Sequence, residues 1–133
     1  MWVFRMSDNY RTDEWILKLF DNYYDPCPYN SEYDPELDLN GLNVNWGSFV
    51  IKNGYEGVFV NPPYSRPLEW VKKAILEKGK NPNINIVMLL KNDSSTRYYR
   101  ILNEFGSNFL FPYGRLKYQS GKSAPFSSVL VVL

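Results

Sequence analysis

Histidine is absent from the sequence, and cysteine occurs once in its 133 residues. Without histidine, Ser-His-Asp and Cys-His catalysis are excluded, together with most transition-metal sites. Because Cys27 is alone, no disulfide can form within the chain, and we interpret this residue as a small buried apolar group rather than a nucleophile. We expect no metal site. Any chemistry must rest on carboxylates, amides, aromatic rings, the backbone and a bound cofactor.

Long apolar runs are also missing. No segment approaches the length that spans a membrane, and residues 1–5 lack the charged head and apolar stretch of a signal peptide. We therefore expect a soluble, cytoplasmic protein without membrane contact. The length fits a single domain over residues 1–133, and the high aromatic content, 17%, is typical of a folded chain rather than a disordered tail.

Neither sign of charge dominates, since the formal net charge is +1. The distribution is uneven: residues 1–64 carry ten acidic and four basic side chains, and residues 65–133 carry four acidic and eleven basic ones. An acidic half that hosts a cationic cofactor, beside a basic half that follows a phosphate backbone, would suit a nucleic-acid enzyme. The alternative is that these charges only solvate the surface.

The most informative stretch is Asn61-Pro62-Pro63-Tyr64, which follows the apolar residues 58–60. The apolar residues predict a short buried strand, and the prolines end it because they cannot donate to a ladder. In a parallel sheet this end of a strand faces the ligand crevice. The corner could offer the Asn61 amide, the carbonyls of Asn61 and Pro62 and the Tyr64 ring to one small planar group. The alternative is a simple strand-ending turn.

Before this corner the pattern predicts a helix and then a strand. Thr12 is a suitable N-cap for a helix whose apolar face is formed by Trp15, Ile16, Leu19 and Phe20. Residues 21–25 predict the first strand, which the prolines of Asp25-Pro26-Cys27-Pro28 end.

Two further features precede the corner. Residues 29–47 are rich in turn residues, so we expect mostly loop. Asn53-Gly54 is a two-residue hairpin signal between the apolar residues 49–51 and Tyr55.

After the corner, Pro67 suits the first position of a helix with an apolar stripe, an i,i+4 pair of Glu69 and Lys73, and an end at Gly79. Further elements are predicted in this order: a buried strand over 84–90, a helix with Tyr98, Ile101, Leu102 and Phe105 on one face running to Gly106, and strands over 109–111 and 127–133.

This alternation predicts an α/β fold: a compact, Rossmann-like, mostly parallel sheet with helices on both faces. No helix separates 109–111 from 127–133, so at least one of these two strands near the C-terminus is expected to run antiparallel.

Seven motifs together resemble the phage-type (Dam-like) DNA adenine-N6 methyltransferase family over nearly the whole chain. In order they are Thr12-Asp13-Glu14-Trp15, Asp25-Pro26-Cys27, Asn40-Gly41-Leu42 with Trp46, Asn61-Pro62-Pro63-Tyr64, Val87-Met88-Leu89-Leu90, Gly114-Arg115-Leu116 and Ala124-Pro125-Phe126. The Asn-Pro-Pro-Tyr corner is the most specific. The resemblance implies a phage-like viral protein in the host cytoplasm, with a methyltransferase sheet, S-adenosylmethionine as cofactor and duplex DNA with a flipped adenine as substrate.

The resemblance also implies roles for single residues. Asn61 and Pro62 would hold the target amino group, and Tyr64 would stack on the extruded base. The cofactor would contact Asp25, Pro26 and Cys27 along its border, Thr12 near its methionine end, and Asp38 to Asn40 near its adenine. The basic residues expected to contact DNA are Arg97, Arg115 and Lys117.

Departures from the family pattern leave alternatives open. The place of the glycine-rich cofactor loop reads Asp25-Pro26-Cys27-Pro28, and Asn40 stands where Asp usually precedes Gly-Leu. No stretch is long enough for a separate recognition domain, so loops 92–97 or 113–123, or a second subunit in a homodimer, would read the DNA sequence. The acceptor could instead be RNA or a glutamine amide. Another alternative is a catalytically decayed methyltransferase fold that binds nucleic acid or acts in assembly.

Overall fold

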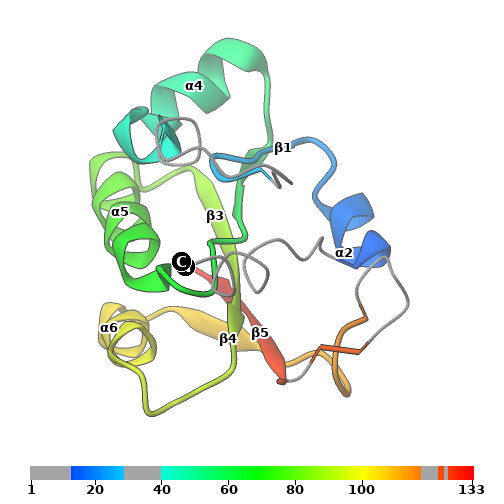
Figure 1. The fold of residues 1–133 in the computed structure, drawn as a ribbon. Coiled ribbons are helices and arrows are strands. Elements are labelled where there is room, and N and C mark those ends of the chain that lie inside the picture. Colours follow the sequence, from blue (N-terminus) through cyan, green and yellow to red (C-terminus); the bar gives the residue numbers. More distant parts are fainter. Residues whose placement is uncertain (1–12, 29–39, 118–122, 125) are drawn as a thin grey trace.

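The computed structural model describes residues 13–28, 40–117, 123–124 and 126–133 (Figure 1). The predicted α/β class is confirmed, since these residues form a five-stranded sheet with helices packed against it. In chain order the elements are α2 (Glu14–Leu19), β1 (Tyr23–Tyr24), the 3-10 helix η1 (Asn40–Asn43), α4 (Trp46–Asn53), β2 (Gly57–Val60), α5 (Pro67–Lys80), β3 (Asn85–Lys91), α6 (Arg97–Phe105), β4 (Asn108–Leu110) and β5 (Ser128–Val132).

The sheet has the strand order β1-β2-β3-β5-β4. The pairs β1–β2 and β2–β3 are parallel, whereas β5 is antiparallel to both of its neighbours, β3 and β4. The predicted antiparallel strand near the C-terminus is therefore present. The sheet is more mixed than expected, because the insertion of β5 makes half of the strand pairings antiparallel.

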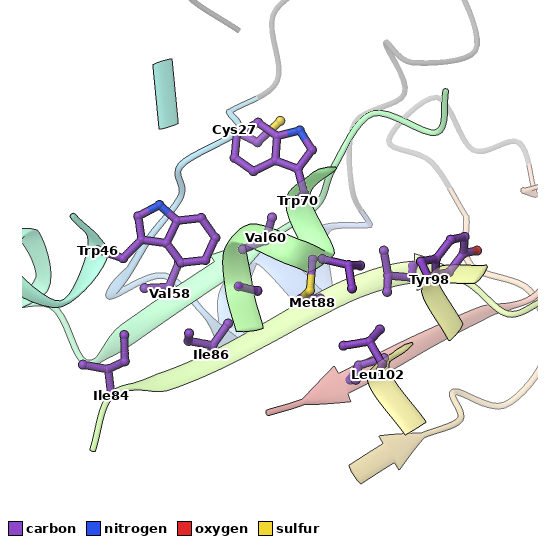
Figure 2. Close-up of a cluster of buried hydrophobic side chains, with 14 of the residues drawn as sticks. Cys27, Trp46, Val58, Val60, Trp70, Ile84, Ile86, Met88, Tyr98 and Leu102 are labelled. Atoms are coloured by element: carbon purple, nitrogen blue, oxygen red, sulfur yellow. The ribbon is translucent and has the colours of Figure 1, made fainter. Parts of the chain in front are cut away.

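Helices cover both faces of the sheet, as predicted (Figure 1). Alternate residues of β2 and β3 point to opposite sides, so Val58 and Val60 join one apolar cluster while Phe59 joins another. The larger cluster packs under α4, α5 and α6, with Trp46 and Trp70 fully buried (Figure 2). The smaller cluster lies beneath α2 on the other face.

The helix predicted from Trp15, Ile16, Leu19 and Phe20 exists as α2, but its buried apolar face is narrower than predicted. Ile16 is fully buried and Phe20 stacks on Phe59 with ring centroids 4.7 Å apart. Trp15 and Leu19 are instead 45% and 60% exposed, because a helix of six residues presents only a narrow stripe to the sheet. Thr12, the predicted N-cap, lies outside the described residues.

The Asn53-Gly54 hairpin prediction is wrong, because these residues end the helix α4. Gly54 takes the left-handed conformation, with φ 71°, which suits a helix C-cap as well as a hairpin turn. Trp46 and Val50, four residues apart and both buried, give the segment helical rather than strand periodicity. The loop prediction over 29–47 fails at its end, where η1 and the start of α4 form; residues 29–39 lie outside the described part.

The helix α5 begins at Pro67 as predicted but continues through Gly79 to Lys80. The predicted pair of Glu69 and Lys73 is also wrong. Lys73 Nζ lies 3.0 Å from Oε2 of Glu77, and Glu69 pairs with Arg66 at 2.6 Å. The reason is burial: the Glu77 side chain is 1% exposed and requires a cation, whereas the side chain of Glu69 is half exposed.

The other element predictions are confirmed to within about two residues at their ends. They are the strands realised as β3, β4 and β5, the helix α6, which ends at Gly106 with φ 90°, and the first strand, which is shortened to Tyr23–Tyr24. On the predicted apolar face of α6, Tyr98 and Leu102 are buried, but Phe105 is 41% exposed. The strands that carry the predicted site, β1 and β2, are therefore adjacent and parallel.

Candidate active site

The Asn-Pro-Pro-Tyr corner lies where β2 ends, one residue beyond Val60, which pairs with Met88 of β3. Pro62 is buried, and Asn61 and Tyr64 are half-buried. The carbonyl of Pro63 accepts a hydrogen bond from the N–H of Arg66 at 3.0 Å, which closes the turn into α5. The corner is thus held by the strand on one side and by a helix start on the other.

A cavity of about 270 Å³ opens beside the corner. Its walls come from the corner, from the carboxyl end of β3, and from the start of α6. The lining residues are Pro62, Pro63, Tyr64, Pro67, Leu89, Leu90, Lys91, Asp93, Thr96 and Tyr98. Asn61 does not line it. Apolar walls with a few polar groups are typical of a site for a small planar ligand.

The β3–α6 wall of this cavity is fixed by two hydrogen bonds. The hydroxyl of Tyr98 donates to the carbonyl of Lys91 at 2.7 Å, and the hydroxyl of Thr96 donates to the carbonyl of Asp93 at 2.7 Å. Burial raises the pKa of Tyr98, the hydrogen bond with Thr96 opposes this, and the nearby Asp93 charge adds to it. The Tyr98 hydroxyl therefore stays protonated at neutral pH and remains a donor.

Phe126 brings a second aromatic ring to the corner. Its ring centroid lies 4.9 Å from that of Tyr64, with the planes inclined by 79°. Lys91 Nζ lies 5.7 Å from the centroid of the Phe126 ring, so a cation faces the same group. Sequence analysis assigned no role to Phe126 or Lys91. The signal was present, because Lys91 ends the strand beside β2 and parallel neighbours end at the same edge.

The 3-10 helix η1 lies against the end of β1, where the first segment expected to border a cofactor begins. A Cβ atom built on Gly41 would fall 1.9 Å from the carbonyl oxygen of Pro26, so only glycine permits this approach of η1 to the end of β1. Cys27 is buried, and its N–H donates to Oδ1 of Asp25 at 3.0 Å. The structure thus brings Asp25, Pro26 and Cys27 together with the backbone of Asn40 and Gly41.

Asp25 has a raised pKa for an aspartate. The residue keeps exposed surface, but its carboxylate lies among enough protein atoms that burial raises its pKa from 3.8 to about 6, against the lowering effect of the Cys27 N–H. A cation beside this carboxylate would favour the ionised form.

The remaining predicted site residues are less closely grouped. Thr12 and Asp38 lie outside the described residues. Arg97 is exposed at the first position of α6, next to the 92–96 loop that borders the cavity. Arg115 and Lys117 are exposed on the segment after β4, where the N–H of Lys117 donates to Oδ2 of Asp13 at 3.0 Å.

The described part of the chain has no helix that combines the length and the apolar character needed to cross a membrane. Nor does it contain a group of three or more His, Cys, Asp or Glu side chains that could hold a metal ion.

Comparison with known proteins places the chain in a family. No curated protein and no solved structure gives a significant match. A family model described as DNA N-6-adenine-methyltransferase (Dam) matches residues 5–127, a range that includes the corner, Asp25-Pro26-Cys27, η1 and the basic residues after β4. The chain therefore belongs to the DNA N-6-adenine-methyltransferase (Dam) family and is a DNA adenine methyltransferase.

Proposed function

We propose that this enzyme transfers a methyl group from S-adenosylmethionine to the exocyclic N6 amine of an adenine that is flipped out of duplex DNA. The observation that carries the proposal is the position of the Asn61–Tyr64 corner. It follows β2 at the same sheet edge as Asp25-Pro26-Cys27, because Tyr24 of β1 pairs in parallel with Val58. On its other side it borders the cavity. A Rossmann-like methyltransferase sheet uses such an edge for its ligands.

The acceptor amine requires two hydrogen-bond acceptors. Its lone pair is delocalised into the base, and acceptors on both N–H groups favour the pyramidal form that develops in the transition state. We assign these roles to Oδ1 of Asn61 and the carbonyl of Pro62. The Pro63 carbonyl already accepts a hydrogen bond from the N–H of Arg66, so we assign the second role to the carbonyl that precedes it. No general base is needed while the amine stays neutral.

The extruded base requires an aromatic surface, since leaving the duplex stack costs about a few kcal/mol. Tyr64 supplies a ring at the cavity wall, and Phe126 meets it at nearly a right angle. Leu89 and Leu90 extend the apolar wall. These residues would compensate part of the unstacking cost and orient the base beside the corner that carries Asn61.

The residues beside the corner fit S-adenosylmethionine. This cofactor supplies a methyl group that its sulfonium has already activated for transfer. Asp25 offers a carboxylate whose raised pKa favours pairing with a cation. Gly41 places no side chain between η1 and Pro26, so the two segments meet through backbone atoms beside the proposed cofactor site. The chain thus provides an anionic and a backbone-rich surface without a glycine-rich loop.

A methylation assay with labelled cofactor tests the proposal. We expect label in duplex DNA as N6-methyladenine, and none in a duplex whose adenines are already N6-methylated. Single-stranded RNA and a glutamine peptide serve as competing acceptors, and label in either with none in DNA would contradict the substrate assignment. Calorimetry with S-adenosylmethionine tests the decayed alternative, which predicts no binding even at about millimolar cofactor.

A further inference from the structure

We propose that Trp46 is a positioning residue that sets cofactor affinity by holding η1 against Pro26, without touching the cofactor itself. This inference rests on the function proposed above, because it assigns a new role to a residue behind the cofactor-bordering segments. One line of contacts runs from α5 through Trp46 and Gly41 to the end of β1.

Trp46 is bonded at both ends. It is fully buried and lies in the larger apolar cluster beside Val58 (Figure 2). Its backbone N–H donates to Oε1 of Glu77 at 2.6 Å, and its indole N–H donates to the carbonyl of Gly41 at 2.9 Å. Trp46 therefore connects helix α5, through its backbone N–H, to η1, through its indole ring.

The α5 end of this connection is rigid. Glu77 is 1% exposed, and its Oε2 lies 3.0 Å from Nζ of Lys73. Lys73 Nζ also donates to the carbonyl of Val44 at 2.7 Å and lies 5.6 Å from the centroid of the Trp46 ring. These contacts hold the backbone on both sides of the α4 N-terminus against α5. The backbone of Trp46 is therefore fixed relative to α5.

Close packing strengthens the same junction. A Cβ atom built on Gly47 would lie 2.6 Å from Nδ2 of Asn81, so the first turn of α4 is pressed against the end of α5. At the other end of the connection, the backbone of Gly41 touches Pro26 with no room for a Cβ atom. A displacement of Gly41 must therefore also displace Pro26 and its neighbour Asp25.

Removing the indole N–H should loosen η1 selectively. The Gly41 carbonyl would lose its donor in a buried place, which is costly unless η1 shifts toward water. The acceptor corner follows a different strand, β2, and does not depend on this bond. We therefore expect weaker cofactor binding with little change in the rate at saturating cofactor.

The chain offers a matched control. Trp70 is also fully buried in the larger apolar cluster, but its indole N–H has no hydrogen-bond partner among the described residues. Trp46→Phe and Trp70→Phe remove the same atoms from the same cluster. Only the first removes a hydrogen bond, so the difference between the two variants isolates the contact with Gly41.

The experiment measures S-adenosylmethionine affinity by calorimetry, kcat at saturating cofactor, and hydrogen exchange of the amides of residues 40–43. For Trp46→Phe we expect about tenfold weaker cofactor binding, kcat within about twofold of wild type, and faster exchange at 40–43. Trp70→Phe should change cofactor affinity by less than about twofold. Gly41→Ala, which forces η1 away from Pro26 directly, should reproduce the loss of affinity if Trp46→Phe folds poorly.

The outcomes separate this inference from the proposed function. Equal cofactor affinity in Trp46→Phe and Trp70→Phe would overturn the role of Trp46, as would equal acceleration of exchange at 40–43 in both variants. A wild-type protein that binds no S-adenosylmethionine would overturn the proposed function and, with it, the effect on affinity. The exchange data would then still show whether Trp46 holds η1.

Discussion

Phe126 meets Tyr64 at nearly a right angle, with ring centroids 4.9 Å apart. One residue follows β2 and the other precedes β5, so the contact joins distant parts of the chain at the edge of the cavity. Edge-to-face contacts of this kind restrain ring orientation at a modest gain of about 0.5–1.5 kcal/mol. Tyr64 is therefore presented to the cavity in a defined orientation before any base arrives.

Tyr64→Ala should reduce kcat/KM for DNA by about 10- to 100-fold, because stacking on a base contributes about 1–3 kcal/mol. Cofactor affinity should stay close to wild type. Tyr64→Phe keeps the ring and should retain most activity. Steady-state kinetics with DNA and calorimetry with the cofactor measure the two effects, and an equal loss of both in Tyr64→Ala would contradict stacking on the base.

Asn61→Ala should reduce the methyl-transfer rate by about 100-fold or more, because one of the two acceptors on the amine disappears. Asn61→Asp retains a side-chain oxygen and should keep more activity than Asn61→Ala. Asn103→Ala, on the exposed surface of α6, serves as the control. Single-turnover rates and thermal unfolding are the measurements. Wild-type turnover in Asn61→Ala would remove this residue from the mechanism.

Arg115 and Lys117 are expected to neutralise DNA phosphates. Replacing both with alanine should lower the slope of log K against log salt by about two, because each phosphate contact contributes roughly 0.9. Arg97→Ala should lower it by about one. Lys52 and Lys72, exposed on α4 and α5, provide a control pair with the same change in charge. A slope that matches wild type in the Arg115 and Lys117 variant would place DNA elsewhere.

Asp25 should make the stability of the protein fall, and its cofactor affinity rise, as the pH increases. Because burial raises its pKa to about 6 in the folded state, its contribution to stability is full below its unfolded pKa of 3.8 and is lost as the pH rises through about 6. Asp25→Asn should therefore raise the unfolding temperature at about pH 8 but not at about pH 3. Cofactor affinity should instead rise with pH in wild type and stay flat in Asp25→Asn. Thermal unfolding and calorimetry across this range test both statements.

Glu77 should stabilise the fold in a pH-dependent way. Burial alone would raise its pKa, but the hydrogen bond from the Trp46 N–H and the charge of Lys73 outweigh burial and lower it below 4.5. Its contribution is therefore present above pH 4.5 and is lost as the pH falls below that value. Glu77→Gln should cost about 1–3 kcal/mol at neutral pH, with a smaller difference in acid.

A matched variant at an exposed glutamate checks whether burial causes the stability loss expected for Glu77→Gln. Glu104 pairs with Arg100 at 3.1 Å on the exposed face of α6, so Glu104→Gln should change stability by less than about 1 kcal/mol. Denaturant unfolding at several pH values measures both variants. Equal costs for Glu77→Gln and Glu104→Gln would contradict a buried anchor at Glu77.

Local signals explain which elements could be predicted from the sequence. Pro67 begins α5 and Gly106 ends α6 because each residue satisfies a backbone requirement of a helix end. Residues 86–90 are continuously apolar, and this run indicated a strand buried on both faces, as they are in β3. The position of the corner after β2 followed from the same kind of reasoning.

Long-range contacts explain what could not be predicted. Gly54 has a positive φ that serves a hairpin or a helix end equally well, and only the packing of Trp46 and Val50 decides between them. Lys73 pairs with Glu77 rather than Glu69 because Glu77 is buried by α4. The meeting of Phe126 with Tyr64 likewise depends on β5 lying beside β3, which no local pattern specifies.

The reversed direction of β5 also determines where a tether can be attached. The N–H of Leu133 donates to the carbonyl of Ile86, near the amino end of β3, whereas the cavity is lined by Leu89 to Lys91 at the other end. A fluorophore or surface linker attached at position 133 would leave from the rim of the sheet opposite the cavity. Single-molecule recordings of DNA capture could therefore use this attachment point while the cavity stays accessible.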